Sequence, residues 1–251
     1  MKFLKNLFKA GALMAILALT ACSSNPAEKY YKSIPAEFDA MCQRAIDEWK
    51  VPGMAVAVVK DGEVVFLKGF GNAHLGDSTM APVPVTPQTQ FVIASTSKAF
   101  TSGLLANVMD EYPEIKWDAP VKNYLPDFKL YDPWVTENFQ VREIMSHHSG
   151  FHSYALDDLP TWGYSRDDLY RIYATVRPSF SFRTKYAYNN SMYTIAAKII
   201  EKYTGKSWDD ALAERIFAPL EMKNSTTGNK SFYIAETLAQ GYRMRKAEDK
   251  H

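Results

Sequence analysis

Apolar residues recur along the chain with two different periods, which divide it into a short sheet-forming part and a longer helical part. Residues 35–50 carry apolar side chains at helical spacing and predict an amphipathic helix. Residues 53–60 and 63–69 are rich in valine, and Asp61-Gly62 between them strongly favours a β-hairpin turn. The first strand is apolar on both faces, so we expect the sheet to be covered on both sides.

Beyond residue 97 the spacing is mostly helical, with interruptions by loops that contain Pro or Gly. The preceding residues, 76–90, are rich in Pro and Thr and predict a loop. Five helices are expected, over residues 97–109, 141–145, 165–175, 191–204 and 208–217. No internal repeat or low-complexity segment interrupts this order.

Ser95 and Lys98 stand three positions apart at the head of the first of these helices. Residues at this spacing share one helix face, with Cβ atoms about 5–6 Å apart, so the hydroxyl and the amine can meet over one substrate. A serine hydroxyl needs such a neighbouring base to act as a nucleophile. The pair indicates an acyl-transferring serine enzyme, although a motif this short also occurs by chance.

Tyr188 and Asn190 form the only Tyr-x-Asn sequence in the chain. A positive charge beside a tyrosine favours its phenolate, which could take the proton of Ser95. The amide of Asn190 offers one acceptor and two donor hydrogens for holding a substrate amide. The alternative is structural, with Tyr188 as a core aromatic and Asn190 as the cap of the helix that ends before Gly205.

Composition excludes several other classes of function. The formal net charge is +1, and no block of like charges or Gly-rich phosphate loop occurs, which argues against a nucleic-acid partner. His147, His148 and His152 cluster in sequence but have no acidic or Cys partner at a ligand spacing, so no metal is expected. Trp162 and Tyr164 are candidates for the rim of a pocket, or for ordinary aromatic surface or core.

The first residues have the pattern of an export signal, with three lysines before an apolar run too short to span a bilayer. The run ends in Leu-Thr-Ala-Cys at Cys22, which resembles a bacterial lipoprotein processing box. Residues 1–21 are then a signal peptide, Cys22 a lipidated first residue and 22–34 a tether. The alternative is a simple secretory peptide with an incidental cysteine. Cys42, the remaining cysteine, is expected to be a buried small hydrophobe.

Beyond the two motifs, the chain resembles the serine β-lactamase and penicillin-binding-protein superfamily, specifically its class C-like branch with D-Ala-D-Ala carboxypeptidases and esterases. The resembling segments follow the expected order: residues 55–71, 91–101, 121–128, 141–151, 188–205 and 216–222. The resemblance implies an α/β (α+β) fold, in which an antiparallel sheet domain built from both chain ends carries an inserted helical domain. Residues 35–245 would form this hydrolase domain and 246–251 a tail.

The resemblance also implies roles for the motif residues. Ser95 would be the catalytic nucleophile, Lys98 and Tyr188 would share the general-base role, and Asn190 would bind the substrate. The residues of 146–150 resemble a supporting loop of the family. No cofactor is implied. The substrate would be a cell-wall peptide, a β-lactam or a small ester, and the protein would be lipid-anchored in the bacterial envelope. Ser23 after the cysteine resembles the signal for the outer membrane, facing the periplasm.

Two departures from the family pattern qualify these expectations. The family's third motif, a Lys-Thr-Gly or a relative on a late strand, is absent from the sequence, so we expect the C-terminal strands of the sheet to be missing. Phe182-Arg183-Thr184 stands where many relatives have Pro-Gly. The alternatives to an active enzyme are a catalytically silent lipoprotein that binds peptidoglycan peptides or a partner, and a truncated fragment of a longer enzyme.

Overall fold

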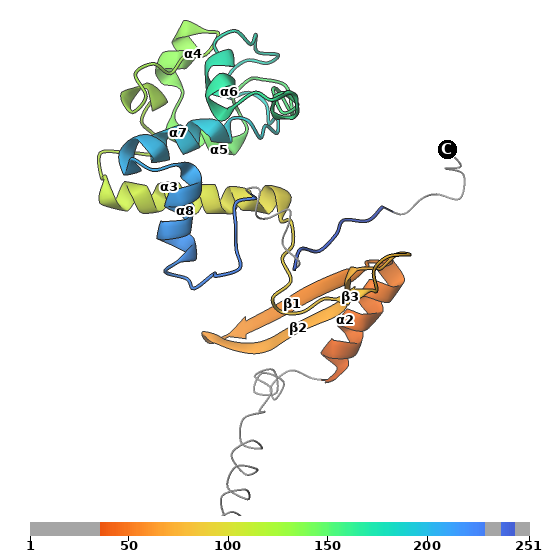
Figure 1. The fold of residues 1–251 in the computed structure, drawn as a ribbon. Coiled ribbons are helices and arrows are strands. Elements are labelled where there is room, and N and C mark those ends of the chain that lie inside the picture. The colour runs from red at the N-terminus through yellow and green to blue at the C-terminus, as the bar shows by residue number, and fades with distance from the viewer. Residues whose placement is uncertain (1–35, 229–236, 244–251) are drawn as a thin grey trace, which may run out of the picture. The chain divides into compact units, whose positions relative to one another are not determined.

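The computed structural model describes residues 36–228 and 237–243, which fall into two compact units (Figure 1). Of the described residues, one unit contains those up to Val92 together with Gly228 and residues 237–243, and the other contains Ile93–Thr227. The predicted signal peptide, Cys22, the tether and the tail at 246–251 lie outside the described residues. Within the described residues, no helix is long and apolar enough to cross a membrane.

The first unit is a helix packed on a three-stranded antiparallel sheet. Helix α2 spans Ala36–Trp49, and strands β1 (Gly53–Lys60), β2 (Glu63–His74) and β3 (Val83–Pro84) follow in the order β1-β2-β3. The turn at Asp61 and Gly62 has positive φ at both residues, 52° and 79°, which is the geometry of the predicted hairpin.

Strand β2 runs five residues past its predicted end at Gly69. A Cβ at Gly69 would lie 2.1 Å from the carbonyl oxygen of Val85, so glycine here marks a close approach of two backbones and not the end of a strand. Sequence spacing alone does not distinguish these two uses of glycine.

The core of this unit lies between α2 and one face of the hairpin. Cys42 and Ile46 of α2 are buried against Phe66 and Phe70 of β2, as predicted for Cys42. The opposite face of β1 is exposed at its three residues Ala55, Ala57 and Val59. The expectation of cover on both faces is therefore not met in the part of the chain that the structure describes, where the only helix of this unit packs on one side.

Both ends of the chain contribute to the first unit. Gln90 pairs with Leu238 in an isolated parallel bridge, and the N–H of Gln240 donates to the carbonyl of Ala73 at 2.8 Å. The Tyr242 hydroxyl accepts the N–H of Leu75 at 2.7 Å. The helical unit is thus inserted into the chain of the sheet unit, as the fold prediction requires.

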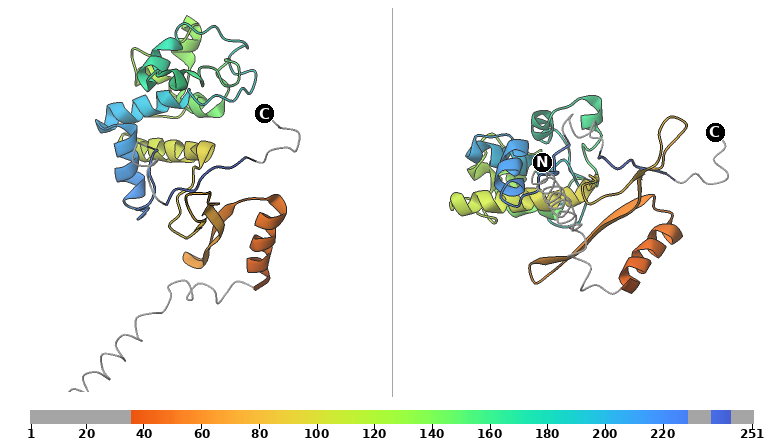
Figure 2. Two further views of the ribbon diagram at one scale, coloured as in Figure 1. Left: turned by 45° about the vertical axis from the view of Figure 1, so that its right-hand side comes forward. Right: turned by 60° about the horizontal axis from the view of Figure 1, so that its bottom comes forward.

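The second unit is helical. Its longer helices are α3 and α7, which lie side by side (Figure 2). The α-helices are α3 (Lys98–Glu111), α4 (Pro133–Asn138), α5 (Val141–Ser146), α6 (Arg166–Ile172), α7 (Tyr193–Thr204) and α8 (Trp208–Leu212). The short 3-10 helices are η2 (Ala94–Ser97), η3 (Val121–Asn123) and η4 (Leu159–Trp162), and η5 (Ala213–Phe217) is a π-helix that follows α8. Helix α4 was not predicted, because six residues are too few for a periodic pattern, although Asp132 caps it ahead of a proline at its first position.

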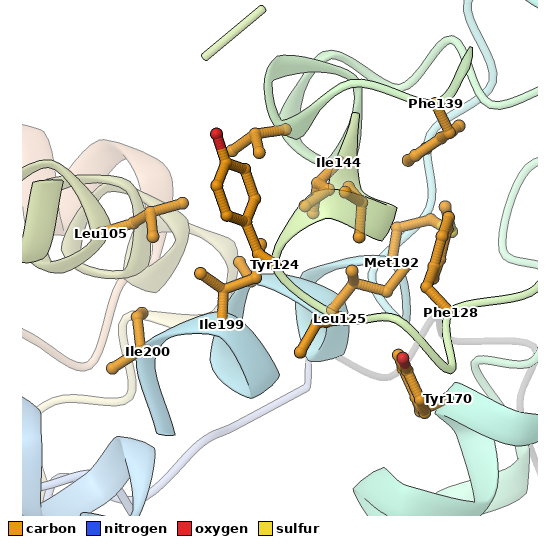
Figure 3. Close-up of a cluster of buried hydrophobic side chains, with 14 of the residues drawn as sticks. Leu105, Tyr124, Leu125, Phe128, Phe139, Ile144, Tyr170, Met192, Ile199 and Ile200 are labelled. Carbon is orange, nitrogen blue, oxygen red and sulfur yellow. The ribbon is translucent and has the colours of Figure 1, made fainter. Parts of the chain in front are cut away.

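One apolar core holds the helical unit together. Leu105 of α3 and Ile199 and Ile200 of α7 gather in a single cluster with side chains from the intervening loops (Figure 3). All three are fully buried. Helix α7 ends at Thr204, just before Gly205, as predicted; the φ of Gly205, 66°, is the left-handed conformation typical of a helix C-terminus. This packing fixes the start of α3 beside the segment that leads into α7.

Candidate active site

Ser95 and Lys98 lie where the 3-10 turn η2 continues into α3. Ser95 is exposed, Lys98 is half-buried, and Lys98 Nζ donates a hydrogen bond to Ser95 Oγ at 3.2 Å. Ala94, just before the serine, has a φ of 45°, a conformation that alanine rarely adopts. Such strained positions cluster at active sites and ligand clamps, so this residue is a second pointer to the turn.

Tyr188 and Asn190 reach the same point from the loop before α7. Lys98 Nζ donates to the Tyr188 hydroxyl at 2.6 Å and to Asn190 Oδ1 at 2.5 Å. The Tyr188 hydroxyl in turn donates to Ser95 Oγ at 2.6 Å. The structure therefore brings together all four residues that the two motifs singled out.

The alternative assignment of Asn190 as a helix cap does not match its contacts. Asn189 accepts the N–H of Met192 through Oδ1 at 3.0 Å and is fully buried. The side chain of Asn190 instead contacts Lys98 on one side and Asp157 on the other. The side chain that bonds to the backbone just before α7 is therefore that of Asn189 and not that of Asn190, a distinction that a Tyr-Asn-Asn sequence does not reveal.

Tyr188 is placed to exchange a proton with Ser95. The hydrogen bond from Lys98, and after it the bond to Ser95, lowers the pKa of the Tyr188 hydroxyl below its usual value. Once Tyr188 has lost its proton, it can only accept, and the 2.6 Å bond reverses so that the serine hydroxyl donates. The arrangement can therefore increase the nucleophilicity of Ser95.

A cavity of about 340 Å³ opens beside Ser95. It is lined by Ala94, Ser95, Ser97, Lys98, Thr101, Asn190, Tyr193 and Trp208. The predicted rim candidates Trp162 and Tyr164 do not line it; they are exposed on and just after η4.

The comparisons with known proteins agree with this geometry. The sequence matches the family described as Beta-lactamase over residues 38–250. The chain belongs to the beta-lactamase family. It is 36% identical over 214 residues to an unguisins hydrolase of Aspergillus campestris, covering 82% of this chain and 39% of that protein. It is 36% identical over 183 residues to a D-aminopeptidase of Brucella canis, covering 70% of this chain and 33% of that protein.

Solved structures of this fold are similar as well. A penicillin-binding protein homologue from Pyrococcus abyssi has a TM-score of 0.65 and 26% identity, over 84% of this chain and 48% of that one. FmtA from Staphylococcus aureus has a TM-score of 0.62 and 25% identity, over 84% of this chain and 56% of that one. The predicted beta-lactamase-like fold and the superfamily resemblance are confirmed, and the chain spans about two fifths or less of the curated relatives named above.

Beside the beta-lactamase-family site, His147 supports Tyr188 from behind. His147 is buried, and its ring centroid lies 4.5 Å from that of Tyr188. Its Nδ1 accepts the N–H of Asn189 at 3.1 Å, which requires that nitrogen to be unprotonated. Burial, and then the charge of Lys98, lowers the pKa of His147, consistent with a neutral ring. Among the described residues, no group of three His, Cys, Asp or Glu side chains is arranged to hold a metal ion.

A buried polar network fixes the segment that carries Tyr188 and Asn190. The Tyr173 hydroxyl lies 2.8 Å from Asn189 Oδ1 and 2.5 Å from Ser191 Oγ. Ser191 Oγ donates to the carbonyl of Ala155 at 2.6 Å, and Asn189 Nδ2 donates to the same carbonyl at 3.1 Å. These satisfied contacts hold the loop rigidly, because breaking any of them would leave a buried polar group unpaired.

Arg183 is the middle residue of Phe182-Arg183-Thr184, the segment that differs from the family pattern, and its side chain connects two parts of the helical unit. Its guanidinium forms an ion pair with Glu143, whose side chain is 6% exposed, and donates to the carbonyl of Asn138 at 3.1 Å. Glu143 also accepts the N–H of Gln140 at 2.7 Å, in the capping box of α5. Arg183 thus ties its loop to the start of α5, ahead of His147.

Sequence reasoning missed three residues around Tyr188. Tyr154 and Tyr186 are exposed; the Tyr154 ring lies 5.6 Å from that of Tyr188, and the Tyr186 ring 5.5 Å from that of His147. Asp157 contacts Asn190. None of the three belongs to a motif whose spacing indicates chemistry, so only the fold reveals them.

Proposed function

We propose that Ser95 is the nucleophile of this serine hydrolase and that the reaction passes through an acyl-enzyme. The observation that carries the proposal is the closed set of hydrogen bonds among Ser95, Lys98 and Tyr188, with distances of 2.6 to 3.2 Å. A nucleophile within hydrogen-bond reach of a base that a third group orients is the signature of covalent catalysis.

In the proposed first step, the Tyr188 phenolate takes the proton of Ser95 while Ser95 Oγ bonds to the substrate carbonyl carbon. The protonated Tyr188 then gives that proton to the leaving group as its bond to the carbonyl carbon breaks. Lys98 stabilises the phenolate and keeps its own position through Asn190. Water later bonds to the acyl carbon while the Tyr188 phenolate takes a proton from it. The bond from the acyl carbon to Ser95 Oγ then breaks, and Tyr188 returns the proton to Ser95 Oγ, which restores the serine hydroxyl and releases the acid.

The turn that carries Ser95 can also stabilise the negative charge that develops on the substrate carbonyl oxygen during the reaction. Ser95 is the second residue of η2, so its N–H is among the first donors of the turn, which have no acceptor within a helix. Such an N–H favours negative charge nearby, and one oxyanion donor contributes about 10² to 10³ in rate. We assign this role to Ser95 N–H.

The substrate is proposed to be a cell-wall peptide, a β-lactam or a small ester. The name of one relative, a D-aminopeptidase, favours a peptide that contains a D-residue over a simple ester. The cavity beside Ser95, with the rings of Tyr193 and Trp208 in its lining, suits an apolar or aromatic group on the acyl side.

Turnover of three substrates tests the proposal. A chromogenic cephalosporin, a nitrophenyl ester and a D-alanyl nitroanilide should include at least one that the protein hydrolyses, and Ser95→Ala should remove that activity. Thr96→Ala, at an exposed neighbour that does not line the cavity, is the matched control and should keep most of it. Lack of turnover by the wild type together with tight binding of a peptidoglycan peptide would favour the silent binding protein instead.

A further inference from the structure

A carboxylate that no motif predicts lies directly behind Asn190. Asn190 Nδ2 donates to Asp157 Oδ2 at 2.5 Å, and the N–H of Ser191 donates to the other oxygen, Oδ1, at 3.2 Å. Asp157 is half-buried and lies on the far side of the Asn190 amide from Lys98. Building on the proposed function, we propose that Asp157 is a positioning residue that determines which end of the Asn190 amide faces Lys98.

The chemistry of the three groups makes the orientation of the amide unique. An ionised carboxylate has only acceptors, so Asp157 selects the NH2 end of Asn190. Because the amide is planar, its oxygen then points the opposite way, where Lys98 Nζ donates to it at 2.5 Å. An ammonium has only donors, so it selects the same orientation from the other side.

Turning the amide over would be costly at both ends. Its NH2 would face the Lys98 ammonium, and its oxygen would face the Asp157 carboxylate. Lys98 has three N–H donors and in this structure three acceptors for them, namely Ser95 Oγ, Tyr188 Oη and Asn190 Oδ1. Loss of the third acceptor would free the lysine to leave the position from which it stabilises the Tyr188 phenolate.

The loop that carries Asp157 is held in place by backbone contacts to the catalytic segment. The N–H of Tyr154 donates to the carbonyl of Tyr188 at 2.7 Å, and the carbonyl of Ala155 accepts from Asn189 and Ser191. Tyr154 and Leu156 both have left-handed backbone conformations, with φ of 63° and 65°. These contacts hold the loop against the site, so the Asp157 carboxylate stays beside the Asn190 amide.

Asp157→Asn is the decisive variant, because it preserves size and an acceptor for the Ser191 N–H but can present an NH2 group to Asn190. We expect kcat/KM to fall by about tenfold to hundredfold, the range for losing a hydrogen bond to a charged group. Asp158→Asn, at an exposed neighbour whose backbone carbonyl bonds to Thr161, should change kcat/KM less than twofold.

A double-mutant comparison separates positioning from general structural support. If Asp157 acts through the Asn190 amide, adding Asp157→Asn to Asn190→Ala should reduce kcat/KM by less than twofold. A further tenfold loss in that background would mean that Asp157 supports the fold of the site and would overturn the proposal.

An NMR readout tests the same contact without turnover. In the side-chain amide spectrum of the wild type, one NH2 proton of Asn190 should lie well downfield and exchange slowly, because it bonds to a carboxylate. Asp157→Asn should remove this signature. If no substrate is turned over, the proposed function fails while the spectrum still decides the orientation. An Asn190 signal like that of a solvent-exposed amide in the wild type would overturn the positioning role.

Discussion

Tyr188 connects the charge of the site to the rate of its reaction. Its hydroxyl contacts both the nucleophile and Lys98, and its pKa is lowered chiefly by the bond to Lys98. Since the phenolate is the form that accepts the proton of Ser95, the fraction of phenolate sets the rate of acylation at a given pH. The acylation rate therefore rises with pH, because more of Tyr188 is then deprotonated.

We therefore predict that the acylation rate constant rises with pH to a plateau, with a midpoint below 10.0, the ordinary tyrosine value. Lys98→Met should move that midpoint to higher pH, because it removes the bond that favours the phenolate, and Tyr188→Phe should abolish the rising limb. Stopped-flow acylation over a pH series measures this. A midpoint that stays fixed in Lys98→Met, or a limb that survives Tyr188→Phe, would assign the titration to another group.

At the residue scale, the sequence was sufficient where a motif has a fixed spacing. Ser95 and Lys98 share a helical turn, so their meeting was predictable from spacing. The resemblance to the family, and not any spacing, implied that Tyr188 and Asn190 join them. The contacts of Asp157 with Asn190 cross 33 positions of the sequence, and nothing in either segment indicates them. Long-range contacts of this kind depend on how the loops fold over α3 and α7.

At the scale of the elements, the loop at Arg183 and helix α5 depend on one ion pair. Glu143 is almost completely buried, and its cationic partner is Arg183. A buried carboxylate that loses its partner keeps its desolvation cost, so this pair affects stability more than the exposed ion pairs do.

We predict that Arg183→Gln lowers the free energy of unfolding by about 2 kcal/mol, the size of a lost hydrogen bond to a buried charged group. Arg177→Gln is the matched control, because Arg177 is exposed and bonds to the exposed Tyr131 hydroxyl; its effect should stay within about 0.5 kcal/mol. Urea titration measures both. Equal effects of the two substitutions would show that the Glu143 pair does not stabilise the loop.

The elements themselves were predicted well where periodicity or turn chemistry was strong. The hairpin at Asp61-Gly62, helix α2 and helices α3 and α7 match the predicted ranges to within a few residues. The sequence analysis missed the short helix α4 and the extension of β2 beyond Gly69. Helix α4 has too few residues to show a periodic pattern, and the residues after Gly69 have no distinctive strand pattern. Exposure of the second face of β1 was also unexpected, because an apolar strand does not reveal which of its faces is covered.

At the scale of the whole molecule, the sheet unit takes residues from both chain ends, and the catalytic candidates all lie in the inserted helical unit. The resemblance to the family predicted the insertion of the helical unit, which periodicity alone does not indicate; it did not predict that all the catalytic candidates lie within that unit. The proposed attachment to the envelope depends on residues outside those that the structure describes, and so it needs its own experiment.

We predict that Cys22 is the lipidated first residue of the mature protein. In a bacterial host, a clickable fatty-acid analogue should label the wild type in the membrane fraction, and Cys22→Ser should remove the label. Cys42→Ser, at the buried cysteine, is the control and should leave labelling unchanged. A soluble, secreted and unlabelled wild type would support the simple secretory peptide.

The most direct test of the central claim is to find which atom of the protein becomes acylated. A mechanism-based serine reagent, such as a fluorescent penicillin or a fluorophosphonate, is incubated with the protein, and intact mass and peptide mapping locate the adduct. The account predicts one adduct per chain, on Ser95, which Ser95→Ala eliminates. An adduct on Thr96 or Ser97, or labelling that survives Ser95→Ala, would contradict it.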